Sequence, residues 1–404
     1  MMDSCTTNYA VAQASDAAAV VRDETITSVM DVQAGCRWLA ELPIPPFQQH
    51  RILRGGHLQT LIGARMGHTD HVGDAVHRCH SIELADGDTL VAHDDEPQNW
   101  TPAKGSVLLL HGICGCHSAG YMVRFQRRLN EHGIRTFRLD MRGCGDSAPL
   151  CRSITHAGRS EDVLAAIEFI ARLVDDVSSP IGALGVSLGA NQLLLAAGRV
   201  GSGKHTAPVG WDRVGPLLAI APPMDLQLCS DAMESAKLRF YNWYFIKHLL
   251  RRASAPLRER DDYQAMLRLP KPKTLRQFDR QFTAPLAGFD NERDYYRASS
   301  AVSVAADIAV PTLIVTSADD PLVPVRSFTT LADRLAQRTQ QGTAPKAAGL
   351  HHGAVRVHIS AAGGHHGFMQ RDRTGWTDEL VSDFYGSAFA SSPARSLTAA
   401  SDVG

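Results

Sequence analysis

Short apolar segments alternate with amphipathic segments along most of this chain. Eight segments rich in aliphatic and β-branched residues predict strands at 81–84, 89–93, 106–110, 136–140, 181–186, 217–221, 312–316 and 355–360. Four segments with apolar residues at i, i+3 and i+4 predict helices at 121–132, 160–174, 188–197 and 327–338. The first two strands flank an Asp-Gly turn and predict a hairpin. The rest of the pattern is typical of an α/β fold with a mainly parallel central sheet and helices on both faces.

Three segments depart from this alternation. Residues 1–42 are mostly small and polar and lead into a proline cluster, and residues 387–404 are rich in Ser and Ala, so both predict flexible extensions. The folded domain then covers residues 43–386. Within it, residues 224–300 carry aromatic and basic helical segments between two predicted strands, which predicts an inserted helical cap.

Composition narrows the class of protein. With 404 residues, 44% hydrophobic and 21% charged, the chain has enough apolar material for a large core, which excludes a disordered or fibrous protein. The net charge of -1 provides no global attraction for nucleic acid. Eight cysteines are too sparse for a disulfide scaffold, and we find neither a signal peptide nor a membrane-spanning apolar run. These features predict a soluble, cytoplasmic protein.

Positive charge is concentrated in the expected cap. Between Lys237 and Arg280 there are 12 Lys and Arg residues but only 4 Asp and Glu residues, interleaved with aromatic side chains. Such a surface suits peripheral contact with an anionic membrane or an acyl substrate with a negative head group. The alternative is a cap whose aromatic residues pack on the core and whose cations are merely solvated. The sequence leaves both interpretations open.

One pentapeptide suggests nucleophilic catalysis. The segment 185–189 reads Gly-Val-Ser-Leu-Gly, which fits the G-x-S-x-G elbow that presents a serine on a sharp turn between a strand and a helix. The predicted strand before it and the predicted helix after it supply the required context. We therefore expect Ser187 to be a nucleophile, with the alternative that the turn carries an incidental serine.

An activated serine needs an imidazole base and a carboxylate that orients it. Asp319 and Asp320 follow one late predicted strand, and His365 and His366 follow the last predicted strand. In each pair only one residue can take the catalytic role, and the other is its neighbour in the chain. Upstream, a strand ends in His111-Gly112, a turn that commonly supplies a backbone N–H to an oxyanion hole. The oxyanion donors are then the amides of Ile113 and Leu188. Metal-ligand and phosphate-loop patterns fail in spacing or context, so we expect neither a metal nor another cofactor.

Together these residues resemble the YheT-like branch of the α/β-hydrolases, which also includes membrane-associated phospholipases and medium-chain acyl-ester synthase/esterases. The resemblance covers roughly residues 43–385 and rests on a series of short motifs. They are His57-Leu58-Gln59-Thr60, His111-Gly112, Arg142-Gly143-Cys144, the elbow with Ala190-Asn191, Phe278-Asp279, Thr283-Ala284-Pro285-Leu286, Gly288-Phe289, Asp294-Tyr295-Tyr296, Asp319-Asp320-Pro321 and Gly363-Gly364-His365. The resemblance implies the α/β-hydrolase fold, with Ser187 as nucleophile, His365 as base and Asp320 as acid.

The function expected from this set is hydrolysis of carboxylic esters, implied by the resemblance to be medium-chain or lipid acyl esters, through an acyl-enzyme on Ser187. A small acyl ester is the expected partner. Three alternatives remain open: acyl transfer to an alcohol, a catalytically idle lipid- or protein-binding protein of the same fold, and metal-dependent hydrolysis through paired histidines. The acyl length, the physiological substrate and the oligomeric state are not encoded in any pattern that we recognise.

Overall fold

The computed structural model describes residues 26–30, 37–63, 74–341, 355–371 and 375–391. A nine-stranded sheet in the order β1-β9-β8-β7-β6-β4-β5-β3-β2 forms its centre. The strands are β1 (Ile26–Met30), β2 (Val76–Glu83), β3 (Thr89–Glu96), β4 (Ser106–Leu110), β5 (Arg135–Asp140), β6 (Ile181–Val186), β7 (Val214–Ile220), β8 (Thr312–Ser317) and β9 (Val355–Ser360). In this sheet the six strands from β9 to β5 run parallel to one another, whereas the pairs β1–β9, β3–β5 and β2–β3 are antiparallel.

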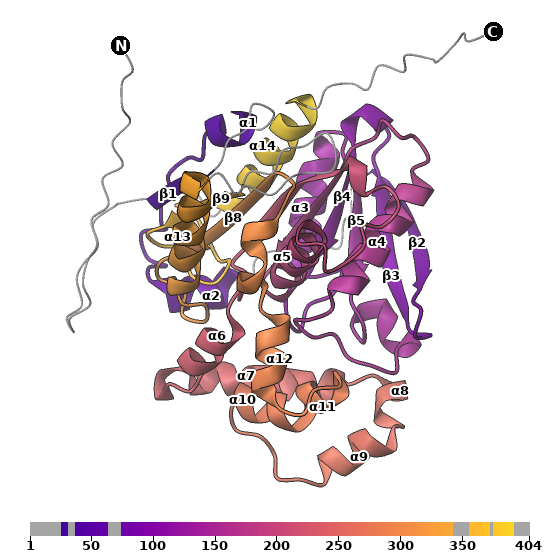
Figure 1. Cartoon of the computed structure of the whole chain (residues 1–404), viewed down its shortest axis with the longest axis vertical. Helices are drawn as coiled ribbons and strands as arrows, with labels where there is room; N and C mark the ends of the chain where they lie inside the picture. The colour runs from indigo at the N-terminus through magenta and orange to yellow at the C-terminus, as the bar shows by residue number, and fades with distance from the viewer. Residues whose placement is uncertain (1–25, 31–36, 64–73, 342–354, 372–374, 392–404) are drawn as a thin grey trace.

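Helices cover both faces of this sheet (Figure 1). They are α1 (Arg37–Glu41), α3 (Gly120–Glu131) and α14 (Trp376–Ser391) on one face, and α4 (Ser160–Leu173), α5 (Leu188–Gly201) and α13 (Arg326–Gln341) on the other. Alternate residues of each central strand supply the two cores: Leu184 and Val186 of β6 pack with α3 and α14, whereas Ile181 and Ala183 pack with α4 and α5. The strands are apolar on both faces because both faces are buried. The predicted α/β-hydrolase architecture is confirmed.

A helical insertion interrupts the alternation between β7 and β8. It contains α6 (Leu226–Met233), α7 (Arg239–Arg252), α8 (Ala255–Arg258), α9 (Asp261–Leu267), α10 (Leu275–Phe278), α11 (Ala284–Leu286) and α12 (Glu292–Ser299). These helices gather at one end of the molecule, and part of the insertion has a small core of its own around Phe278 and Phe282. Below, "the insertion" means residues 226–299.

The chain ends differ from the expected flexible extensions. Both β1 and α1 lie within residues 1–42, and α14 continues to Ser391. Strand β1 pairs with β9, so its hydrogen bonds come from a partner more than 300 positions away, which the polar composition of the segment does not reveal. The other parts of these extensions, 1–25, 31–36 and 392–404, lie outside the described residues. The short helix α2 (Gly56–Gly63) was also not predicted.

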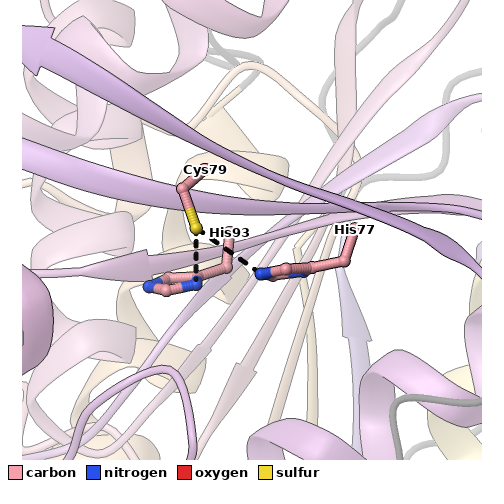
Figure 2. A group of neighbouring side chains, drawn as sticks. All are labelled: His77, Cys79 and His93. Carbon is pink, nitrogen blue, oxygen red and sulfur yellow. Dashed lines mark hydrogen bonds between the residues drawn. The ribbon is translucent and has the colours of Figure 1, made fainter.

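Polar side chains occupy one face of the β2–β3 hairpin at the end of the sheet. Cys79 lies directly opposite His93, and His77 lies opposite Asp95, so these four side chains share a face. Figure 2 shows His77, Cys79 and His93 pointing toward one another from the two strands. The six cysteines within the described residues are free thiols; Cys5 and Cys36 lie outside them.

Candidate active site

Ser187 occupies a sharp turn between β6 and α5. Its φ of 52° lies in the left-handed region, where residues other than glycine are rarely found. Two close approaches impose this turn: a Cβ atom at Gly189 would lie 2.6 Å from the carbonyl oxygen of His111, and one at Gly185 would lie 2.6 Å from the backbone of Ala190. The glycines of the elbow are therefore required by packing.

His365 connects Ser187 to Asp320. Its Nε2 lies 2.8 Å from Ser187 Oγ, and its Nδ1 lies 2.8 Å from Asp320 Oδ2. The other carboxylate oxygen of Asp320 accepts hydrogen bonds from the amides of Leu322 (2.8 Å) and Val323 (3.0 Å). Because a carboxylate only accepts, it holds the proton on Nδ1 and leaves the lone pair of Nε2 facing the serine hydroxyl.

The neighbours of these two residues have different contacts. Asp319 Oδ1 accepts hydrogen bonds from the amide of Gly364 (2.8 Å) and from Ser317 Oγ (2.9 Å), so it fastens the loop that carries His365. The ring of His366 packs against Tyr121, and burial together with neighbouring His365 lowers the pKa of His366 to about 3. Of each pair, only Asp320 and His365 are joined in a chain that reaches Ser187.

The turn after β4 lies against the serine turn. A Cβ atom at Gly112 would be 3.2 Å from Ser187 Cβ, and the next residue, Ile113, lines the same cavity as Ser187 and Leu188. His111 is fully buried; its Nδ1 lies 2.8 Å from the Gly112 carbonyl, and its Nε2 accepts from the amide of Met141. These contacts brace the turn that carries the Ile113 amide.

The sequence did not assign roles to the residues that support the loop carrying His365 and the turn after β4. Thr60 Oγ1, on α2, accepts a hydrogen bond from the amide of His365 at 2.9 Å. Gln59 exchanges hydrogen bonds with the backbone of Met369, and the hydroxyl of Tyr121 accepts from the amide of Gly112. Gln59 and Thr60 belong to the His57-Leu58-Gln59-Thr60 motif, so the resemblance pointed to them without giving their function.

An apolar cavity of about 220 Å³ opens beside Ser187 and His365. The insertion supplies much of its wall, and the sheet domain supplies the rest. Apolar lining residues include Ile113, Leu188, Met233, Phe245, Leu249, Leu257, Phe278, Phe282, Leu286, Leu322 and Val323. A wall of this kind favours the hydrocarbon part of a ligand.

Few charged groups reach this cavity. Burial raises the pKa of Asp279 to about 6, although its Oδ2 accepts a hydrogen bond from Tyr296 at 2.8 Å. Burial lowers the pKa of His156 to about 3, so this imidazole is neutral at pH 7. Burial also raises the pKa of Cys114 to about 11, which keeps it a thiol. Of these groups, only Asp279 changes charge close to neutral pH.

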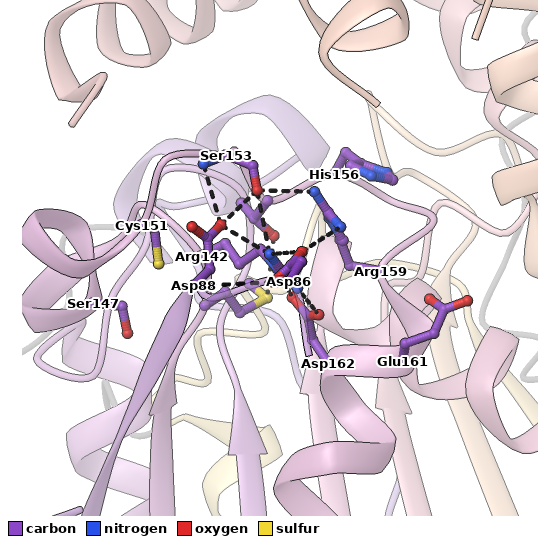
Figure 3. Close-up of polar contacts among 12 residues, drawn as sticks. Asp86, Asp88, Arg142, Ser147, Cys151, Ser153, His156, Arg159, Glu161 and Asp162 are labelled. Carbon is purple, nitrogen blue, oxygen red and sulfur yellow. Dashed lines mark hydrogen bonds and ion pairs between the residues drawn. The ribbon is translucent and has the colours of Figure 1, made fainter. Parts of the chain in front are cut away.

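A buried ion network lies next to the cavity (Figure 3). The Arg142 guanidinium contacts Asp86 (2.6 Å), Asp88 (2.8 Å) and Asp162 (2.8 Å), so it joins the β2–β3 turn to the loop after β5 and to α4. Burial alone would raise the pKa of Asp88, but hydrogen bonds from Ser153 and the Arg152 amide, together with Arg142, lower it. Arg142 also lines the cavity, so the network supports one of its walls.

The chain is similar to several known proteins. Residues 101–353 match the family model described as "Serine aminopeptidase, S33". The YheT protein of Escherichia coli (strain K12) is 28% identical over 247 residues, which are 60% of this chain and 69% of that protein. The Mus musculus protein named phospholipase ABHD3 is 24% identical, covering 66% of this chain and 58% of that protein. A Saccharomyces cerevisiae protein named medium-chain fatty acid ethyl ester synthase/esterase 2 is 23% identical, and the match covers 69% of this chain and 61% of that protein.

The Arg142 network makes a stability prediction. Replacing Arg142 with Met should lower the free energy of unfolding by about 3–5 kcal/mol, because Asp88 and Asp162 are then buried without their counter-charge. Urea unfolding at pH 7 measures the effect. Arg172→Met provides a matched control, because Arg172 pairs with Glu168 on the exposed surface of α4. This substitution should lower the free energy of unfolding by no more than about 0.5 kcal/mol. Equal stability of the two variants would contradict the role of the network.

Proposed function

The chain belongs to the serine aminopeptidase S33 family of α/β-hydrolases, and from this premise we propose that it cleaves carboxylic esters through an acyl-enzyme on Ser187. Its relatives place it in the YheT-like branch. The observation that supports the proposal most is the continuous contact from Ser187 Oγ through both nitrogens of His365 to Asp320, at 2.8 Å in each step.

Each group has one task in the proposed reaction. His365 Nε2 takes the hydroxyl proton as Ser187 Oγ attacks the ester carbonyl, and Asp320 stabilises the imidazolium that forms. The amides of Ile113 and Leu188 donate to the oxyanion, a contribution of about 10²–10³ in rate per donor. His365 then protonates the departing alcohol. Water, activated by the same imidazole, releases the acid and restores the serine.

The substrate class follows from the cavity. Its apolar wall suits an aliphatic acyl group, and we propose that the insertion acts as a cap over that group. The relatives named above include a phospholipase and an ester synthase/esterase, which is consistent with acyl esters as substrates. Transfer of the acyl group to an alcohol in place of water is a variant of the same proposal, since one acyl-enzyme serves either acceptor.

The first prediction from the proposed function concerns the nucleophile. Ser187→Ala should abolish both p-nitrophenyl ester hydrolysis and labelling by a fluorophosphonate probe, while leaving the melting temperature nearly unchanged, because the variant removes one hydroxyl only. Cys114→Ser is the matched control: this side chain lines the same cavity and should remain labelled. Labelling of Ser187→Ala at the wild-type level would exclude an acyl-enzyme on this residue.

The second prediction separates the neighbouring pairs. Asp320→Asn should reduce kcat by about 10⁴-fold, because an amide no longer selects the productive tautomer of His365. Asp319→Asn should cost far less, since Asp319 holds only the loop. The kcat of His365→Ala should likewise be far lower than the kcat of His366→Ala. Steady-state kinetics with one p-nitrophenyl ester tests both rankings, and reversal within either pair would move the proposed role to the neighbour.

The insertion also carries an exposed aromatic surface. On α7, Phe240, Trp243 and Tyr244 are 50%, 54% and 38% exposed, whereas Tyr241 is buried. Lys247 Nζ lies 4.6 Å from the centroid of the Trp243 ring. The aromatic residues therefore divide between an inner and an outer face of the helix. We propose that the outer face, with Lys247 and Arg251, contacts anionic lipid. No helix among the described residues has the length and apolarity needed to span a bilayer.

The third prediction tests this contact. Binding to vesicles containing phosphatidylserine should fall steeply with ionic strength. The double variant Lys247→Ala/Arg251→Ala should weaken binding by about 30-fold, since each cation near the membrane contributes about 1 kcal/mol. Arg172→Ala/Lys204→Ala removes the same charge outside the insertion and should bind like the wild type. Absence of binding at low salt would refute the membrane contact and leave the esterase proposal intact.

A further inference from the structure

The polar face of the β2–β3 hairpin contains a second cluster of reactive side chains, outside the cavity described above. His77 and Cys79 come from β2 and His93 comes from β3 (Figure 2). Their ligand-type atoms lie within 4.8 Å of one another. None of the three residues lines the esterase cavity. The proposed ester hydrolysis therefore leaves this cluster without a task.

Hydrogen bonding determines which imidazole nitrogens face the thiol. His77 Nδ1 lies 2.7 Å from Asp95 Oδ1, and His93 Nε2 lies 3.3 Å from Asp140 Oδ2. Carboxylates accept and do not donate, so in neutral histidines these two nitrogens carry the protons. The remaining nitrogens, His77 Nε2 and His93 Nδ1, then present lone pairs, and each lies 3.5 Å from Cys79 Sγ.

This arrangement is incomplete without a further group. A thiol has one proton, so it can donate to only one of the two imidazole lone pairs that converge on it. A divalent cation would accept both lone pairs and the thiolate together. In a tetrahedral zinc site, with Zn–N of about 2.1 Å and Zn–S of about 2.3 Å, nitrogen and sulfur lie about 3.6 Å apart. The separation of 3.5 Å between Cys79 Sγ and each histidine nitrogen matches that value.

We propose that His77, Cys79 and His93 bind a zinc ion across the β2–β3 hairpin. Thiolate and imidazole ligands favour Zn²⁺ over Mg²⁺ or Ca²⁺. Asp95 and Asp140 supply the carboxylates that commonly orient metal-binding histidines through the opposite ring nitrogen. His77 is 39% exposed and Cys79 is also exposed, so the fourth position faces solvent and takes a water molecule. On binding, Cys79 releases its proton and Zn²⁺ remains in the same oxidation state.

An overlapping group fits the ion less well. His93, His117, Asp140 and Asp146 also lie within ligand distance of one another. However, Asp140 already accepts from His117 Nδ1 (2.7 Å), from the His117 amide (2.6 Å) and from the Asp146 amide (2.8 Å). Its Oδ2 accepts from three donors, and in neutral histidines the ring nitrogens that face it carry protons and offer no lone pair to an ion. This group therefore supports His93 and does not itself hold the ion.

The site has a mechanical consequence for the fold. Among the described residues, strand β2 lies at the end of the sheet and pairs with β3 alone. A zinc ion bound by His77 and Cys79 of β2 and by His93 of β3 would link the two strands through bonds stronger than the hydrogen bonds between them. Binding to the folded state alone raises its stability by mass action. We therefore expect zinc to raise the melting temperature.

Zinc titration of tag-free protein, stripped with a chelator and dialysed, tests the proposal. Competition with a chromogenic zinc indicator should show one tightly bound equivalent, and Co²⁺ should produce a thiolate charge-transfer band. Cys79→Ser and His77→Gln should each weaken zinc binding by at least about 100-fold and remove the rise in melting temperature; both side chains are exposed, so both variants should fold. Ester hydrolysis should be unchanged in both, which separates this site from the esterase proposal.

Two controls make the outcome decisive. His80→Gln alters the histidine on the opposite face of β2, which is paired with Asp94, and should bind zinc like the wild type. Asp146→Asn alters the exposed carboxylate of the overlapping group and should also bind normally. Absence of a tightly bound equivalent, or binding that survives Cys79→Ser but fails in Asp146→Asn, would overturn the proposal.

Discussion

The close approach of two turns, one after β4 and one after β6, is the constraint on which the site depends. Only a hydrogen atom fits at Gly189 beside the His111 carbonyl, and only a small residue fits at Gly112 beside Ser187. This contact holds Ser187 in the left-handed region and faces its hydroxyl toward the loop after β9. Because β4, β6, β8 and β9 run parallel, the loops at their carboxyl ends meet at one edge of the sheet. The fold therefore brings together residues that are 178 positions apart in the chain.

The sequence predicted these elements where local pattern determines structure. Strands such as β4 and β6 consist mostly of apolar residues because both faces are buried, so their bounds could be predicted to the residue. Strand β1 and helix α2 were missed because their stability comes from distant partners: β1 pairs with β9, and Gln59 of α2 bonds to Met369. The sequence showed the two candidate pairs, Asp319-Asp320 and His365-His366, but not which residue of each pair points toward Ser187. That depends on how each loop turns, and the resemblance rather than periodicity favoured Asp320 and His365.

Several buried ion pairs lie beside the sheet. Arg142 pairs with carboxylates of the β2–β3 turn and of α4, and Arg138 and Arg135 of β5 donate to Asp95 and Asp94 of β3. The net charge of -1 conceals this arrangement, because a sum over the chain says nothing about pairing. Arg142 was visible in the sequence only as part of a motif. Its carboxylate partners come from two separate segments, the β2–β3 turn and α4, so no local pattern could identify them.

Helix α7 connects two surfaces. Its outer face carries Trp243, whereas its last residue, Arg252, reaches inward and donates to the carbonyl of Cys114, the residue next to Ile113. This hydrogen bond joins the C-terminal end of α7 to the turn that carries the Ile113 amide. Coupling of this kind is reciprocal: if docking of the outer face shifts the oxyanion turn, then occupancy of that turn shifts the affinity of docking by the same factor. If the proposed membrane contact and the proposed ester hydrolysis both hold, α7 is the element that links them.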